Sequence, residues 1–284
     1  MEQRKIGTVG VGAIGLGAMP LSVEGHPDPE RSQATIHAAL DAGVTLIDTA
    51  DAYTPDGQYG HNEGVVARAL ASYRDDSSDV IVATKGGHTR NGDDWDVDGR
   101  PEYLRTACER SLRQLGVDAI GLYQHHRPDP KVAYEDTMGG LRELLDAGMI
   151  QRAGVSNANP DQIRLAHEII GDGLVSVQNQ LSPAFRSSLP EIRVCDELGL
   201  AFLPWSPLGG IGKARDLASK HRAFAAVADK HEASPQRVCL AWLLALSPRV
   251  IPIPGASRPE SIRDSVAAAD LDLDEADLEA LNAT

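Results

Sequence analysis

The sequence predicts one α/β domain, residues 1–284, folded as a (β/α)8 (TIM) barrel. Short apolar or β-branched runs recur along the chain, and longer segments with helical spacing of Ala, Leu and Ile separate them. Uniformly apolar strands are typical of a parallel sheet covered by helices. The length of 284 residues suits one closed barrel, since such barrels commonly have about 250 residues. A doubly wound open sheet is the alternative.

Eight segments are the expected strands, in chain order: 13–17, 45–48, 80–84, 119–124, 152–156, 175–178, 200–205 and 250–254. Four of the helices between them have clear ends. They span 28–43, 100–116, 133–148 and 159–171, each closing on a glycine, and Pro101 and Pro160 stand in first turns. Two connections, 85–100 and 206–222, are unusually long and follow strands three and seven. Because barrel enzymes place their sites at the carboxyl ends of the strands, these two loops are expected to wall a pocket.

A glycine-rich motif stands near the N-terminus. Residues 10–15, GVGAIG, match the GxGxxG pattern of a dinucleotide-binding turn, which requires a helix to begin at the last glycine. Pro20, Pro27 and Pro29 follow within fifteen residues and oppose such a helix. We therefore interpret the motif as something other than a Rossmann turn, so a dinucleotide would have to be held elsewhere.

Composition excludes several classes of partner. The net charge of −14, with 41 acidic and 27 basic residues, opposes binding to nucleic acid or to an anionic membrane. No apolar run is long enough to cross a membrane, and none follows the N-terminal charges as in a secretory signal, so a cytoplasmic location is expected. Cys108, Cys195 and Cys239 have no CxxC spacing and are expected to be reduced, buried apolar fillers.

Polar side chains follow successive expected strands where those strands end. Asp48 ends the second strand, Tyr53 follows five residues later, Lys85 ends the third, and His125 and His126 end the fourth. Each alone has an ordinary structural explanation, such as a loop cap, a rim aromatic or a solvated lysine. Since the strand ends of a closed barrel meet on one rim, their joint placement predicts a proton-transfer site.

These residue types suggest specific chemistry. A neighbouring ammonium is expected to lower the tyrosine pKa from about 10, which would make Tyr53 an acid, and Asp48 would keep Lys85 charged. An imidazole could donate a hydrogen bond to a carbonyl oxygen and stabilise the alkoxide formed as hydride arrives. His125 and His126 cannot both ligate one ion from a regular strand, and neither HxH nor HExxH occurs, so no metal is expected.

The sequence resembles the aldo-keto reductase family over nearly its whole length. The matching stretches are GLGAM, GVTLIDTADAY, VIVATKGG, GRPEYLR, LYQHHRPDP, GVSNANPDQI, VQNQLSP, LPWSPLGG and VIPIPGASRPESI. The resemblance implies a (β/α)8 barrel that reduces a small carbonyl substrate with NAD(P)H and has no Rossmann turn. Its motifs are most similar to those of bacterial reductases of aldehydes such as pyridoxal. We expect a monomer or weak homo-oligomer.

The resemblance also implies roles for individual residues. The catalytic positions fall on Asp48, Tyr53, Lys85 and His126; the last is chosen over His125 because it precedes Arg and Pro in HHRP. The implied cofactor is NADP(H). The residues implied around its nicotinamide end are Gly17, Ala18, Met19, Ser156, Asn157, Gln178 and the ring of Trp205. Those implied at its pyrophosphate are Ser206, Leu208 and Gly210. Ser257 and Arg258 would contact its adenosine 2′-phosphate, with Asp264 near the adenine. Gly255 and Ser261 stand where many members carry a lysine and an arginine.

Two other functions stay open at this point. The same barrel can serve as a cofactor-sensing regulatory or binding subunit with slow catalysis, which would keep the same residues. A metal-dependent barrel hydrolase is the third possibility.

Overall fold

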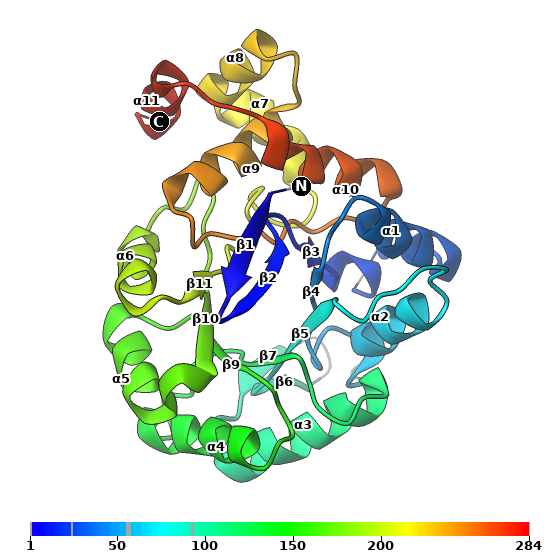
Figure 1. Ribbon diagram of the computed structural model, residues 1–284, viewed down its shortest axis with the longest axis vertical. Helices are drawn as coiled ribbons and strands as arrows, with labels where there is room; N and C mark the ends of the chain where they lie inside the picture. Colours follow the sequence, from blue (N-terminus) through cyan, green and yellow to red (C-terminus); the bar gives the residue numbers. More distant parts are fainter. Residues whose placement is uncertain (1, 24, 55–57, 92–93, 284) are drawn as a thin grey trace.

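The computed structural model describes residues 2–23, 25–54, 58–91 and 94–283. Seven parallel strands form one curled sheet in the spatial order β11-β10-β9-β8-β5-β4-β3, and helices surround it as a ring (Figure 1). The strands are β3 (Leu16–Gly17), β4 (Leu46–Asp48), β5 (Ile81–Gly86), β8 (Leu122–His125), β9 (Ala153–Ser156), β10 (Leu174–Gln178) and β11 (Ala201–Phe202). Each lies within or overlaps a predicted strand.

The predicted eighth strand, 250–254, lies between β11 and β3 and closes the barrel without forming a regular strand. Its Ile251 N–H donates to Phe202 O at 2.8 Å, and Gly15 N–H donates to Pro252 O at 2.9 Å. Pro252 and Pro254 have no N–H, so the ladder toward β3 lacks the bonds that these two residues would donate. The closed barrel is therefore confirmed, and the open-sheet alternative is wrong.

An N-terminal hairpin, which the sequence analysis missed, plugs one end of the barrel. It consists of β1 (Gln3–Ile6) and β2 (Val9–Gly12), and it lies across the middle of the ring in Figure 1. Ile6 and Val11 pack in the barrel interior with residues such as Leu46. The Arg4 guanidinium fastens the hairpin to carbonyls that precede the closing segment, including Ser247 O at 2.6 Å. The first glycines of GVGAIG thus lie in an antiparallel strand, and no helix begins at the last, which confirms that the motif is not a Rossmann turn.

The helices begin and end where local chemistry predicts. Asn159 forms a capping box with Gln162, and Gly116 adopts φ 69° just after its helix ends. The helices of the ring are α1 (Pro29–Asp41), α2 (His61–Ala71), α3 (Pro101–Leu115), α4 (Tyr134–Asp146), α5 (Pro160–Ile170), α6 (Leu189–Leu198), α9 (Pro235–Leu246) and α10 (Pro259–Val266). Outside it lie α7 (Leu217–Lys220), α8 (Arg222–Lys230) and α11 (Glu275–Asn282), drawn at the top of Figure 1. Short 3-10 turns are η1 (Met19–Leu21), η2 (Gly171–Gly173), η3 (Ala214–Asp216) and η4 (Ala267–Asp270).

The predicted loop 85–100 contains an antiparallel hairpin instead of irregular chain. Its strands are β6 (His88–Asn91) and β7 (Asp94–Val97). The three cysteines are buried and free, as expected. Within the described ranges, no helix is long and apolar enough to span a bilayer.

Gly17 makes the closest backbone approach in the barrel seam, and its replacement tests that seam. A Cβ at Gly17 would lie 2.8 Å from Ile253 O, a backbone atom that cannot turn away. We expect Gly17→Ala to lower the free energy of unfolding by about 1–3 kcal/mol in denaturant titrations. Gly139→Ala in α4 is the matched control, because a Cβ there meets no atom within 4 Å. The control should be neutral or stabilising by up to about 1 kcal/mol. Equal stability of the two variants would contradict the tight seam.

Candidate active site

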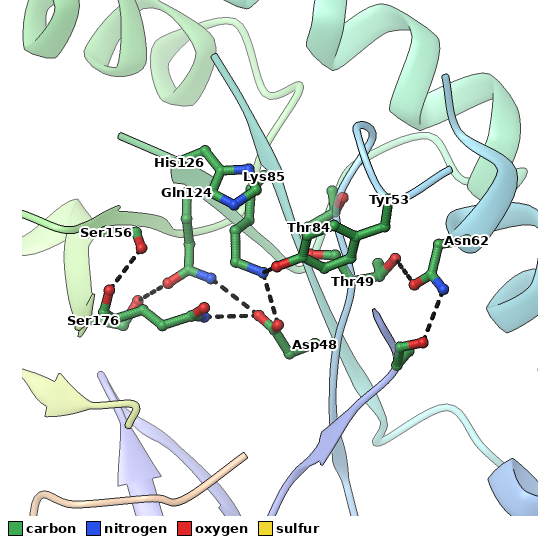
Figure 2. A network of polar contacts seen from close by, with 12 residues as sticks. Asp48, Thr49, Tyr53, Asn62, Thr84, Lys85, Gln124, His126, Ser156 and Ser176 are labelled. Carbon is green, nitrogen blue, oxygen red and sulfur yellow. Dashed lines mark hydrogen bonds and ion pairs between the residues drawn. The ribbon is translucent and has the colours of Figure 1, made fainter. Parts of the chain in front are cut away.

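A buried ion pair lies at the carboxyl ends of β4 and β5. The Lys85 ammonium donates to Asp48 Oδ2 at 2.7 Å and to Tyr53 OH at 3.2 Å (Figure 2). It also donates to Thr49 O at 2.8 Å. The Lys85 side chain is wholly buried and that of Asp48 nearly so. The parallel pairing of β4 with β5 brings these strand ends together, so the structure joins three residues that the sequence analysis grouped.

Amide side chains from two more strands hold the other oxygen of Asp48. Gln178 Nε2 donates to Asp48 Oδ1 at 2.7 Å, and Gln124 Nε2 does so at 3.5 Å. Ser176 Oγ in turn donates to Gln124 Oε1 at 3.2 Å (Figure 2). The carboxylate is therefore fixed from three sides, which orients the lysine ammonium toward Tyr53.

Burial and pairing set the charge states of this cluster. Burial alone lowers the pKa of Lys85, but Asp48 and Tyr53 outweigh it, so the lysine pKa is raised and its ammonium persists. For Tyr53 the expected lowering of the pKa is wrong. Burial raises the pKa of Tyr53 above 10 by more than Lys85 lowers it, so the phenol holds its proton at neutral pH.

The two adjacent histidines face different surroundings. The His126 ring meets the Tyr53 ring edge-on, with centroids 5.6 Å apart and an angle of 80° between planes. Its Nδ1 is buried without a hydrogen-bond partner, and burial followed by the Lys85 charge holds its pKa well below 6.5, so the imidazole is neutral. His125 is fully buried beside Tyr134, at 6.2 Å between ring centroids, and burial lowers its pKa to about 4. The structure thus brings His126, and not His125, to Tyr53.

The residues expected around a nicotinamide lie next to this cluster. Gly17 ends β3, and Ala18 N–H donates to Asp48 O at 2.8 Å, with Met19 starting the turn that follows. On the opposite side, Asn157 has φ 56° and donates from Nδ2 to His126 O at 3.0 Å. Ser156 Oγ donates to Gln178 O at 2.6 Å.

Two cavities border the residues that follow β9, β10 and β11. A cavity of about 320 Å³ is lined by residues including Asn157, Gln180 and Trp205, and Gln180 also lines a second cavity of about 300 Å³ with Leu208 and Lys213. The Trp205 indole Nε1 is buried without a partner. Ser206 adopts φ 50° and Gly210 φ 112° in the loop that borders the second cavity. The residues present fit an elongated ligand with a planar polar end, and the basic Lys213, Lys220 and His221 that line the second cavity were missed by sequence analysis.

The expected adenosine-phosphate residues lie at the start of α10. Arg258, which follows Ser257, is exposed and occupies the N-cap position of α10. Its Nε donates to Ser261 Oγ at 2.8 Å. Asp264 accepts from Arg237 of α9 at 2.7 Å and from Ser234 Oγ. The carboxylate is therefore paired with a guanidinium that sequence analysis did not place there, because only the packing of α9 against α10 joins them.

The β6–β7 hairpin adds side chains that the sequence analysis did not single out. The His88 ring lies 4.5 Å from the His126 ring, and the Trp95 ring lies 4.7 Å from His88. The only sequence signal was the unusual length of the connection 85–100. Across the part of the chain that the structure describes, no group of three or more His, Cys, Asp or Glu residues could hold a metal ion.

Comparison with known proteins gives one consistent result. The model of the Aldo/keto reductase family matches residues 13–284. Probable aldo-keto reductase 1 of Glycine max is 34% identical over 306 residues, covering 96% of this chain and 86% of that protein. Uncharacterized oxidoreductase C215.11c of Schizosaccharomyces pombe is 33% identical over 274 residues, covering 95% of this chain and 85% of that protein.

Solved structures with the same barrel include two aldo-keto reductases. The glycerol dehydrogenase AKR11B4 from Gluconobacter oxydans superposes with a TM-score of 0.84 at 26% identity, over 99% of this chain and 94% of that chain. The thermostable aldo-keto reductase Tm1743, solved with the inhibitor epalrestat, gives a TM-score of 0.83 at 26% identity, over 100% and 99% of the two chains.

Proposed function

The chain belongs to the aldo/keto reductase family, and from this premise we propose that it reduces an aldehyde or ketone to an alcohol with a hydride from NADPH. The observation that carries the proposal is the buried triad in which Lys85 Nζ lies 2.7 Å from Asp48 and 3.2 Å from Tyr53 OH. A phenol that shares a buried ammonium is a proton donor whose conjugate base is stabilised in place. In carbonyl reduction, the carbonyl carbon accepts a hydride while such a donor gives a proton to the carbonyl oxygen.

Tyr53 is the proton donor in this proposal. Its O–H donates to the substrate carbonyl oxygen, and as the carbonyl carbon gains a hydride the proton passes from the phenol to that oxygen. The ammonium of Lys85 stabilises the phenolate that remains, and Asp48 keeps the buried lysine charged. The neutral His126 ring donates a second hydrogen bond to the same oxygen and orients the carbonyl.

The two cavities at the ends of β9, β10 and β11 are the proposed binding site of NADP(H). Asn157 and Trp205 would hold its nicotinamide, Leu208 and the loop around it its pyrophosphate, and Arg258 its 2′-phosphate, with Asp264 near the adenine. When bound, this cofactor supplies the hydride. The buried, unpartnered Trp205 Nε1 and the two cavities that share Gln180 as a lining residue support this assignment.

The test is turnover of a generic aldehyde. Purified protein is mixed with NADPH and 4-nitrobenzaldehyde, and the loss of NADPH absorbance is followed. Saturable, enzyme-dependent oxidation of NADPH is expected. Binding of NADPH without oxidation, across a panel of aldehydes and ketones that includes pyridoxal, would support a cofactor-sensing subunit instead.

Cofactor choice depends on Arg258. Its exposed guanidinium can pair with a 2′-phosphate at the N-terminus of α10, whereas NADH has only a hydroxyl at that position. A charge-assisted contact of this kind contributes about 1.5–3 kcal/mol, so we expect an NADPH preference of roughly 10- to 100-fold. Arg258→Ala should weaken NADPH by about that factor and leave NADH nearly unchanged, as read by quenching of protein fluorescence.

The control for this variant is Arg263→Ala, which removes another exposed arginine of the same helix. It should change neither dissociation constant by more than about threefold. Equal weakening of both cofactors by Arg258→Ala would show that this residue acts on the pyrophosphate or on folding, and a wild-type preference for NADH would overturn the NADP assignment.

A further inference from the structure

Four rings and one guanidinium form a continuous row from the proton donor to the rim of the barrel; we name this row the aromatic wall (Tyr53, His126, His88, Trp95 and Arg90). Ring centroids are 5.6 Å apart between Tyr53 and His126, 4.5 Å between His126 and His88, and 4.7 Å between His88 and Trp95. The Arg90 guanidinium carbon lies 4.3 Å from the Trp95 ring centroid. The wall therefore runs from the reacting end of the site to a cation at its outer end.

The register of the β6–β7 hairpin separates its charges onto two faces. His88 pairs with Val97 and Arg90 with Trp95, so these four residues share one face, the face that meets His126. Thr89 pairs with Asp96 and Asn91 with Asp94, so the two exposed aspartates share the other face. The face toward the site thus carries a cation and none of the acids of β7.

Arg90 is held in place and has hydrogen-bonding capacity left over. Its backbone N–H donates to Tyr59 OH at 2.7 Å, and its side chain stacks on Trp95. Its Nε is buried without a hydrogen-bond partner, and within the described ranges no carboxylate lies within 4.0 Å of its guanidinium. Burial, followed by the Arg127, Lys85 and Arg90 charges, lowers the pKa of His88 to about 4, so the wall before Arg90 is neutral.

We propose that Arg90 binds an anionic group, such as a carboxylate, at the far end of the carbonyl substrate, so that the enzyme prefers anionic over neutral aldehydes. This inference rests on the proposed carbonyl reduction. A guanidinium stacked on an indole keeps its N–H edges free, and those edges match two carboxylate oxygens. The rings of the aromatic wall would flank the substrate between its carbonyl and its anionic end.

The experiment compares 4-carboxybenzaldehyde with its neutral relative methyl 4-formylbenzoate in wild type, in Arg90→Met and in Arg113→Met, which removes an exposed arginine of α3. Wild type should have a lower KM for the acid. Arg90→Met should raise that KM by about 10-fold or more, with kcat within about threefold and with little change for the ester. Arg113→Met should match wild type.

A binding measurement separates this inference from the proposed function. Titration calorimetry follows 4-(hydroxymethyl)benzoate with and without NADP+, and no turnover is needed. Carboxylate binding that Arg90→Met abolishes supports the inference even if neither aldehyde is reduced, in which case the proposed function fails. The inference is overturned if Arg90→Met leaves carboxylate binding intact, or if it weakens binding of the acid and of the ester equally. It is also overturned if the preference for the acid is lost in Arg127→Met, which replaces the arginine directly after His126, and not in Arg90→Met.

Discussion

A Tyr53→Phe variant is expected to lose carbonyl reduction by about 100-fold or more while binding NADPH almost as wild type does. The substitution keeps the ring that packs edge-on against His126 and removes only the hydroxyl that Lys85 contacts at 3.2 Å. Without it, the alkoxide that forms has no proton donor in place, and general acid catalysis typically contributes 10²–10⁴-fold. Steady-state kinetics give the loss, and fluorescence quenching gives the dissociation constant of NADPH.

Tyr73→Phe is the matched control, because that phenol lies on the surface and donates to Asp41 at 2.9 Å. It should leave kcat/KM unchanged. If Tyr53→Phe retained activity within about threefold of wild type, Tyr53 would not be the acid. Because burial raises the pKa of Tyr53, the donor stays protonated at neutral pH, and reduction should decline only where alkaline pH removes that proton.

The second large effect is expected from His126→Ala. The variant His125→Ala, at the adjacent residue, is the control. His126 is neutral and its Nδ1 is unpartnered beside Tyr53, so its removal takes a hydrogen-bond donor from the carbonyl oxygen and should lower kcat by about 100-fold. His125 lies on the other face of β8 and packs against Tyr134, so His125→Ala should reduce stability and leave kcat within about threefold.

Kinetics and chemical denaturation of both variants decide the matter. A reversed ranking, with His125→Ala inactive and His126→Ala active, would show that the HHRP stretch is aligned one residue out of register. Loss of folding by His126→Ala would be resolved with His126→Gln, which keeps an N–H donor and should recover part of the rate.

The convergence of Asp48, Lys85 and Tyr53 could be predicted because it follows from topology. Parallel strands in a barrel end on one rim, so residues at successive strand ends must meet there, whatever the packing around them. The direction of the Tyr53 pKa could not be predicted in this way. It depends on how completely the neighbouring chain excludes water from the phenol, and that is a property of packing in three dimensions.

The elements that were missed had weak local signals. The strands of the N-terminal β1–β2 hairpin, QRKI and VGVG, have four residues each, and the two glycines in β2 lower its strand propensity. Arg237 and Asp264 are 27 residues apart and meet only because α9 packs against α10. The closing segment 250–254 was found by its apolar run, but its prolines prevent the regular ladder that the run suggested.

The seam of the barrel also constrains how the chain reaches its native state. Gly17 pairs with Gly255, so the contact that completes the sheet joins residues near the two ends of the described chain, and it has a very high contact order. As the chain is synthesised from its N-terminus, this edge of β3 stays unpaired until the segment around Gly255 has emerged. An edge of only two residues offers little template for pairing with other chains. The short length of β3 therefore limits the edge that is open to other chains before the seam closes.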